Sequence, residues 1–290
     1  MKISNFFKLA VVFFSITMLA SQQKLTMDER SKQIFDEKVK LMEDQIKVAL
    51  SAGSGPVARM EAITHLQRSV AMSGVGSSLP KDKAVSGLGQ IAQVPDSRDV
   101  RKKAVEALRI VAADTAQDEP VYIKAVQELG RIALQSQGDP ETLLSVIEQL
   151  NFIVNQPSVS VKIRYFALGQ LGTAARQAQD KKVCIAAIKN LGGIAMDTQH
   201  FQGNRKMLER AVVEPGLIPI TPNTQGPEVY RAAIEQLGRI GNGSSDDYIR
   251  AAAFDELDKI AAQGVDQAVR QQAQGLNPKT MSQKIKSFFS

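Results

Sequence analysis

A leucine that recurs at nearly constant intervals is the feature of this sequence that most limits its possible folds. Eight of the nine intervals between successive equivalents are 20 to 22 residues long, and the ninth is 25. The series is Leu66, Leu88, Leu108, Leu129, Leu150, Leu171, Leu191, Val212, Leu237 and Leu257. A period of this length is typical of chains built from repeated supersecondary units. We call this residue the reference position and count other positions in each unit from it.

Apolar residues at fixed offsets predict one helix in each unit. Positions −8, −4 and +3 are mostly aliphatic or alanine, as Val121, Ala125 and Ile132 are around Leu129, and these offsets lie on one helical stripe. Residues favoured at helix N-caps stand at position −11, and only Phe201 departs from the pattern. They are Gly55, Ser77, Ser97, Asp118, Asp139, Ser160, Asp180, Gly226 and Asp246. The units therefore predict helices that pair into antiparallel hairpins.

Three fragments carry a family resemblance. "DVRKKAVEALRIVA", "VYIKAVQELGRIA" and "VYRAAIEQLGRIG" resemble the second helix of HEAT repeats, and two units together have the length of one HEAT repeat, about 42 residues. The resemblance implies an all-α solenoid of the armadillo/HEAT superhelix type, with about five helical hairpins over residues 55–277 and a capping helix at each end. Because nearly every helix carries the motif, the assignment of helices to the inner and outer layers stays open. Solenoids serve many unrelated roles, so the resemblance names no function.

The N-terminal sequence is typical of a bacterial export signal. Leu9 to Ala20 is a mainly apolar run of twelve residues after Lys2 and Lys8, shorter than the roughly 20 residues that span a bilayer. We expect residues 1–21 to be a signal peptide, and the protein to be periplasmic or secreted. The alternative is an inner-membrane anchor with a periplasmic body. The single cysteine, Cys184, excludes an intramolecular disulfide and is expected to be a packed apolar residue.

Three further segments lie outside the regular repeat. Residues 24–51 predict an amphipathic helix that caps the first repeat, and residues 278–290 predict a short C-terminal helix. The segment 214–227, "EPGLIPITPNTQGP", predicts a loop without helix because it is rich in proline and glycine. Its apolar tip, Leu217, Ile218 and Ile220, either folds over an adjacent groove or binds a partner.

Position −7 holds mostly basic and tyrosine residues and so supplies most of the candidate binding residues. Arg101, Tyr122, Arg164, Arg205, Tyr230 and Arg250 all stand there. The first interpretation is that they join neighbouring turns by bonding carbonyls and acids. The second is a ladder that faces a ligand. Lys182 is a further candidate because residues 162–210 contain nine basic and three acidic residues, a net charge of +6 that would attract an anionic partner.

The sequence contains no recognisable pattern of catalytic residues or metal ligands. The two histidines, His65 and His200, belong to distant units, and the sequence has no P-loop, HExxH or GxSxG motif. We therefore expect no enzyme activity, no cofactor, no metal and no small-molecule substrate. The leading hypothesis is an exported scaffold that holds a partner protein on the concave face of its solenoid. The alternative is an anionic ligand, either envelope polysaccharide, anionic lipid or nucleic acid, bound by residues 162–210; export makes nucleic acid the least expected of these.

Overall fold

The computed structural model describes eight stretches of the chain, and helices are the only regular secondary structure in them. These stretches are residues 27–72, 78–114, 119–135, 139–198, 200–201, 203–217, 226–263 and 267–276. The chain divides into two units, Met1–Asp44 and Gln45–Ser290, and the boundary falls within helix α2 (Met27–Leu50). The signal peptide, the C-terminal helix over 278–290 and the tip residues Ile218 and Ile220 lie outside the described stretches and stay predictions.

The described part of the first unit is the N-terminal portion of α2. Ile34 and Leu41 on this portion are more than half exposed. The helix expected for residues 24–51 is present from Met27 to Leu50. The role of this helix as a cap over the first repeat stays a prediction.

The second unit is a series of helices of similar length. A short 3-10 helix, η1 (Ala52–Ser54), precedes them. They are α3 (Gly55–Met72), α4 (Ser78–Ile91), α5 (Arg98–Ala113), α6 (Glu119–Gln135), α7 (Pro140–Asn155), α8 (Val161–Gln177), α9 (Lys181–Met196), α10 (Arg205–Gly216), α11 (Pro227–Gly243), α12 (Asp247–Gln263) and α13 (Gln267–Leu276). The ten helices from α3 to α12 correspond to the ten predicted repeat units, and α13 follows them.

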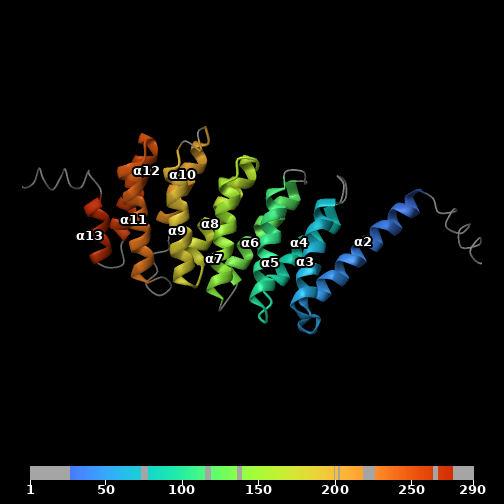
Figure 1. Cartoon of the computed structure of the whole chain (residues 1–290). Coiled ribbons are helices and arrows are strands. Elements are labelled where there is room, and N and C mark those ends of the chain that lie inside the picture. Colours follow the sequence, from blue (N-terminus) through green and yellow to red (C-terminus); the bar gives the residue numbers. More distant parts are fainter. Residues whose placement is uncertain are drawn as a thin grey trace, which may run out of the picture. The chain divides into compact units, whose positions relative to one another are not determined.

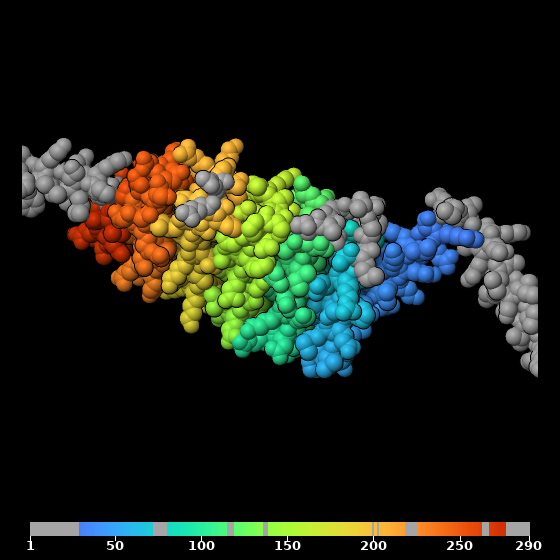
Figure 2. Space-filling model, turned by 45° about the horizontal axis from the view of Figure 1, so that its top comes forward, coloured from blue at the N-terminus to red at the C-terminus, as the bar shows by residue number. Residues whose placement is uncertain are grey.

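These helices form two layers. Each helix packs on the next one in the chain, and also on the helix two positions further along. The odd-numbered helices α3 to α13 therefore form one layer, which we call the odd layer, and α4 to α12 form the even layer. In Figure 1 the hairpins of this unit follow one another in chain order, and in Figure 2 their colours succeed one another as bands. This confirms the predicted all-α solenoid.

The core of the solenoid is the predicted stripe. The ten reference residues, from Leu66 to Leu257, are all fully buried. The residues at −4 are also buried and eight of the ten are alanine, which lets adjacent helices approach closely. A buried leucine contributes about 1.5–3 kcal/mol by removal from water. No hairpin can bury this stripe alone, so successive hairpins must stack.

The predicted caps begin several helices. Ser97, Asp139 and Ser160 each accept a hydrogen bond from the backbone N–H three residues later, and Asp180 accepts from Lys182 and Val183. Helix α10 differs because Phe201 has no side-chain acceptor. It begins only at Arg205, and the Phe201 ring is fully buried instead.

The prediction that the whole segment 214–227 is non-helical is wrong at its start. Helix α10 continues through Glu214, Pro215 and Gly216. A proline in the last turn removes only one i→i−4 hydrogen bond, and the N–H of Leu217 still donates to the Val213 carbonyl at 3.1 Å. The Glu214 side chain, which is buried and paired with arginines, further fixes this turn.

Candidate binding surface

The residues at −7 reach back to the end of the preceding helix. Nε of Arg59 donates to the Ala49 carbonyl and Nε of Arg164 to the Val154 carbonyl, each at 2.7 Å and each ten residues earlier. Carbonyls in the last turn of a helix lack intrahelical partners, and a cation there also complements the helix dipole. At the same position Cys184 donates through Sγ to the Ala178 carbonyl at 3.1 Å. Position −7 therefore closes the C-terminal end of the helix before it.

The same residues also join successive helices within a layer. Arg59 bonds Asp96 at 2.9 Å, and Nε of Arg101 bonds Asp139 at 2.8 Å. The hydrogen bond from Arg59 lowers the pKa of Asp96. Burial alone would raise the pKa of Asp139, but hydrogen bonds from Thr142 and Arg101 lower it below its ordinary value. For Arg59 and Arg101 this is the tie between repeats that the first interpretation describes.

The layers also divide the predicted ladder. Successive helices alternate between layers, so position −7 forms two rows and not one continuous face. Arg101 and Tyr230 belong to the odd layer, whereas Tyr122, Arg164, Arg205 and Arg250 belong to the even layer.

Of the eight candidate binding residues that lie in the described stretches, three are exposed. Tyr122, Arg164 and Tyr230 are buried, and burial lowers the pKa of Arg164 and raises that of Tyr230. Arg101 and Arg250 are half-buried, and Arg250 donates to the Ser244 carbonyl at 2.9 Å. Lys182, Arg205 and Leu217 are exposed.

Acidic residues from flanking helices offset the positive charge of residues 162–210. Five of its nine basic residues pair with four carboxylates outside the segment. The pairs are Lys162 with Glu119, Arg176 and Arg210 with Glu214, Lys181 with Glu228, and Arg205 with Asp246. With these four carboxylates included, nine basic residues face seven acidic ones, and the net charge falls from +6 to +2. The basic segment is thus largely neutralised in three dimensions.

Two arginine–tyrosine stacks lie on the even layer. The guanidinium of Arg210 on α10 lies 4.5 Å from the centre of the Tyr165 ring on α8. The guanidinium of Arg205 lies 4.7 Å from the centre of the Tyr248 ring on α12. Tyr165 and Tyr248 remain 38% and 44% exposed, so both rings are accessible from solvent. One helix, α10, thereby positions a tyrosine on each of its neighbours.

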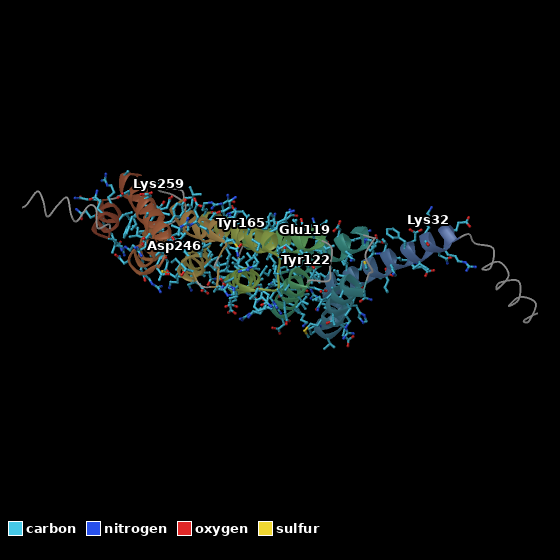
Figure 3. The ribbon with its side chains drawn as sticks, turned by 90° about the horizontal axis from the view of Figure 1, so that it is seen from above. Lys32, Glu119, Tyr122, Tyr165, Asp246 and Lys259 are labelled. Carbon is cyan, nitrogen blue, oxygen red and sulfur yellow. The ribbon has the colours of Figure 1, made fainter. Side chains whose placement is uncertain are left out.

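A hydrogen bond further fixes the second stack. The Tyr248 hydroxyl donates to Oε1 of Glu209 at 3.0 Å, and this bond raises the pKa of Tyr248. The hydrogen bonds that Asp246 accepts from the backbone N–H groups of Ile249 and Tyr248, together with the nearby Arg205, lower the pKa of Asp246. Tyr165 and Asp246 are labelled in Figure 3, on α8 and just before α12. The rings are therefore held in place without being covered.

Glycines on the even layer form notches for acidic and amide side chains. Each of these side chains lies over a glycine of the preceding even helix, so closely that a Cβ there would come within 3.0 Å of it. The pairs are Gly89 with Glu128, Gly130 with Gln170, Gly172 with Glu214, and Gly216 with Glu256. The three glutamates are at least 94% buried.

Basic residues surround these buried carboxylates. Arg131 pairs with Glu128 at 2.6 Å, Arg210 with Glu214 at 3.0 Å, and Lys259 with Glu256 at 2.6 Å. The hydrogen bond from Lys259 to Glu256 raises the pKa of Lys259, which Figure 3 labels on α12. We call the surface that combines these pairs with the two tyrosine stacks the even-layer face; it comprises Glu128, Arg131, Tyr165, Gln170, Arg205, Glu209, Arg210, Glu214, Tyr248, Glu256 and Lys259.

Sequence reasoning missed the two exposed tyrosines. Tyr165 stands at −6 and Tyr248 at −9, so they share no repeat position, and their arginine partners lie 45 and 43 residues away in the sequence. A different signal was present. Glycine follows the reference residue at Gly89, Gly130 and Gly172, and Glu or Gln precedes it at Glu128, Gln170 and Glu256. The same signal also occurs on odd helices, at Gly192, Gly238 and Gln236, so it does not distinguish the two layers.

The described residues give little support for chemistry. No group of three or more His, Cys, Asp or Glu side chains in those stretches could hold a metal ion. Cys184 is buried as expected, and burial raises the pKa of its thiol to about 11. None of the described helices combines the length and apolarity needed to cross a membrane.

Comparisons with known proteins find similarity in structure alone. No family model matches the chain, and no curated protein matches it. Among solved structures, the designed armadillo repeat protein YIII(Dq)4CqI is similar over 81% of this chain and 98% of its own, with 18% identity and a TM-score of 0.35. The designed protein YIII(Dq.V1)4CPAF, solved in complex with peptide (KR)4, covers 82% and 98% with 17% identity and a TM-score of 0.36. Because these identities and TM-scores are low, the assignment of the solenoid architecture depends on the packing of this chain's own helices.

Proposed function

We propose that this chain is an exported scaffold that binds a partner protein through the even-layer face. The observation behind the proposal is the pair of exposed tyrosines held by Arg205 and Arg210 on three successive even helices. Tyrosine and arginine are among the residues that contribute most to binding at protein interfaces. Rings that are already held in position lose little conformational freedom on binding, which favours affinity.

The glycine notches support the same face. Glu214 and Glu256 are buried at these glycines, whereas the basic side chains that pair with them, Arg210 and Lys259, remain 31% and 58% exposed. Adjacent packed helices lie about 8–10 Å apart. A partner segment that crosses α8, α10 and α12 would therefore meet these basic groups and a tyrosine stack on either side of α10.

Export is part of this proposal and is supported by the sequence of residues 1–21. The apolar run Leu9–Ala20 and the single cysteine agree with a periplasmic or secreted protein. Cell fractionation followed by mass determination tests this directly. We expect a periplasmic protein that begins near residue 21, and a protein recovered only from the cytoplasm would refute export.

The binding face can be tested by site-specific photo-crosslinking in the native envelope. Tyr165, Tyr248 and Phe152 are each replaced, one at a time, by photoreactive benzoylphenylalanine. Phe152 is the matched control because it is 43% exposed and lies 4.6 Å from the Arg109 guanidinium, but on the odd layer. We expect one discrete adduct from positions 165 and 248 and none from position 152. An adduct from position 152 alone would refute this face.

The alternative, an anionic non-protein ligand, depends on residues 162–210. The basic residues there that remain exposed and pair with none of these flanking carboxylates include Lys182, Lys189 and Lys206. Polyanion binding should weaken steeply as salt rises and should be lost when these three lysines are changed to glutamate. Binding to a partner protein through the tyrosine stacks should persist in that variant.

A further inference from the structure

A pocket of about 300 Å³ lies at one edge of the solenoid, between two hairpin ends. Ala112 and Ala113 from the last turn of α5, Tyr122 from the first turns of α6, and Ile163 from α8 form much of its wall. Val159 and Ser160, just before α8, complete that wall, and Glu119 and Ser158 also line the pocket. Tyr122 and Glu119, both labelled in Figure 3, lie near each other at the start of α6. This site is separate from the even-layer face, and its argument does not depend on the proposed function.

The next repeat has a phenylalanine ring at the corresponding sequence position, three residues before the N-cap of α10. There position −7 of α8 is Arg164, and position −11 of the following even unit is Phe201. The Arg164 guanidinium lies 4.8 Å from the centre of the Phe201 ring, and that ring is fully buried. At the pocket the corresponding residues are Tyr122 and Ser160. A serine stands where the neighbouring repeat inserts a phenylalanine ring.

The walls of the pocket suit an aromatic guest. Alanine, valine and isoleucine side chains supply apolar surface, and Tyr122 presents a ring against which a second ring can pack offset or edge-on. Ser158, Ser160 and Glu119 place polar groups beside this apolar wall, where a peptide backbone flanking the guest could bond. The volume lies at the lower end of the range for ligand pockets, which suits one side chain better than a large ligand.

We propose that this pocket binds an aromatic side chain of a partner polypeptide beside Tyr122, much as the buried Phe201 ring packs on Arg164 at the corresponding sequence positions of the next repeat. The probe is a capped pentapeptide with a central phenylalanine flanked by serine and glycine, and its twin has a central alanine. Binding is followed by NMR on the methyl groups of Val159 and Ile163 in the full chain. We expect saturable shifts with the phenylalanine peptide, at a dissociation constant on the order of 1 mM, and none with the alanine twin.

Variants that fill the pocket identify the site. Ser160→Phe repeats the arrangement at Phe201 and should weaken binding at least tenfold. Because Ser160 also caps α8, Ala113→Phe is the second variant; it fills the same space and keeps that cap. Gln179→Phe, at an exposed site between α8 and α9, is the control and should bind as the unmodified chain does.

Three results would overturn the proposal. The first is the absence of saturable shifts with the phenylalanine peptide. The second is equal binding of the alanine twin. The third is unchanged affinity in a folded Ala113→Phe chain.

Discussion

Replacing Gly172 by alanine tests whether the glycine notches hold the buried carboxylates in place. A Cβ on Gly172 would overlap the Glu214 side chain, whose carboxylate pairs with Arg176 and Arg210. The Glu214 side chain is 6% exposed, and those of Arg176 and Arg210 are 21% and 31% exposed. The added methyl group must therefore push a largely desolvated carboxylate away from its partners.

The expected free-energy change combines two opposing effects. Alanine is favoured over glycine within a helix by about 1 kcal/mol. Disrupting a buried ion pair costs about 3–5 kcal/mol, and the partial exposure of the two arginines reduces this to about 2–4 kcal/mol. Gly172→Ala should thus lower the free energy of unfolding by about 1–3 kcal/mol.

Gly193→Ala is the matched control for this prediction. Gly193 lies within α9, and a Cβ there would meet no atom within 4 Å, so only the helix-propensity gain of about 1 kcal/mol applies. Thermal unfolding followed by circular dichroism should place the two variants roughly 5–10 °C apart, with Gly193→Ala the more stable. A Gly172→Ala chain as stable as Gly193→Ala would refute the notch.

Three further predictions concern the ties between repeats and the buried thiol. Arg101→Ala should lower the free energy of unfolding by about 2–4 kcal/mol, because the hydrogen bonds to Asp139 and to the Val94 and Pro95 carbonyls are lost. The control is the exposed Arg98, whose replacement by alanine should lower it by less than about 1 kcal/mol. Urea titration of both variants measures the difference. Asp96, Asp139 and Asp246 have lowered pKa values, so the stability that they contribute should be complete above the ordinary pKa of 3.8 and be lost as pH falls through the lowered folded values. Acid titration followed by circular dichroism should therefore show that Asp139→Asn loses less stability on acidification than the unmodified chain does. An equal loss in the two chains would contradict this. Since the pKa of Cys184 is raised to about 11, iodoacetamide at pH 8 should leave the folded chain unmodified and alkylate it in urea, and rapid labelling of the folded chain would contradict this burial.

The sequence predicted the solenoid well because its repeat pattern is local. The fully buried reference residues and the caps at Ser97, Asp139 and Ser160 follow from spacings within a single helix. The prediction for the last turn of α10 was wrong because it considered Pro215 alone. The Glu214 side chain in that turn is held by an ion pair with Arg176 on α8. Local composition cannot show that contact.

The binding surface could be predicted only in part. Position −7 was identified, but its side chains alternate between layers and mostly bond carbonyls and acids within the solenoid. The +6 charge of residues 162–210 was correct in sequence, yet Glu119, Glu214, Glu228 and Asp246 offset most of it from helices outside the segment. The tyrosine stacks depend on which helices are neighbours in space, and the repeat period alone left the assignment of layers open.

The affinity of the crosslinked partner, once purified, tests the proposed face most directly. Isothermal titration calorimetry would compare the unmodified chain with a Tyr165→Ala/Tyr248→Ala double variant and with Phe152→Ala. We predict that the double variant binds about 30-fold more weakly, equivalent to about 2 kcal/mol, and that Phe152→Ala binds within twofold of the unmodified chain. Unchanged affinity in the double variant, or an equal loss in Phe152→Ala, would contradict binding through the even-layer face.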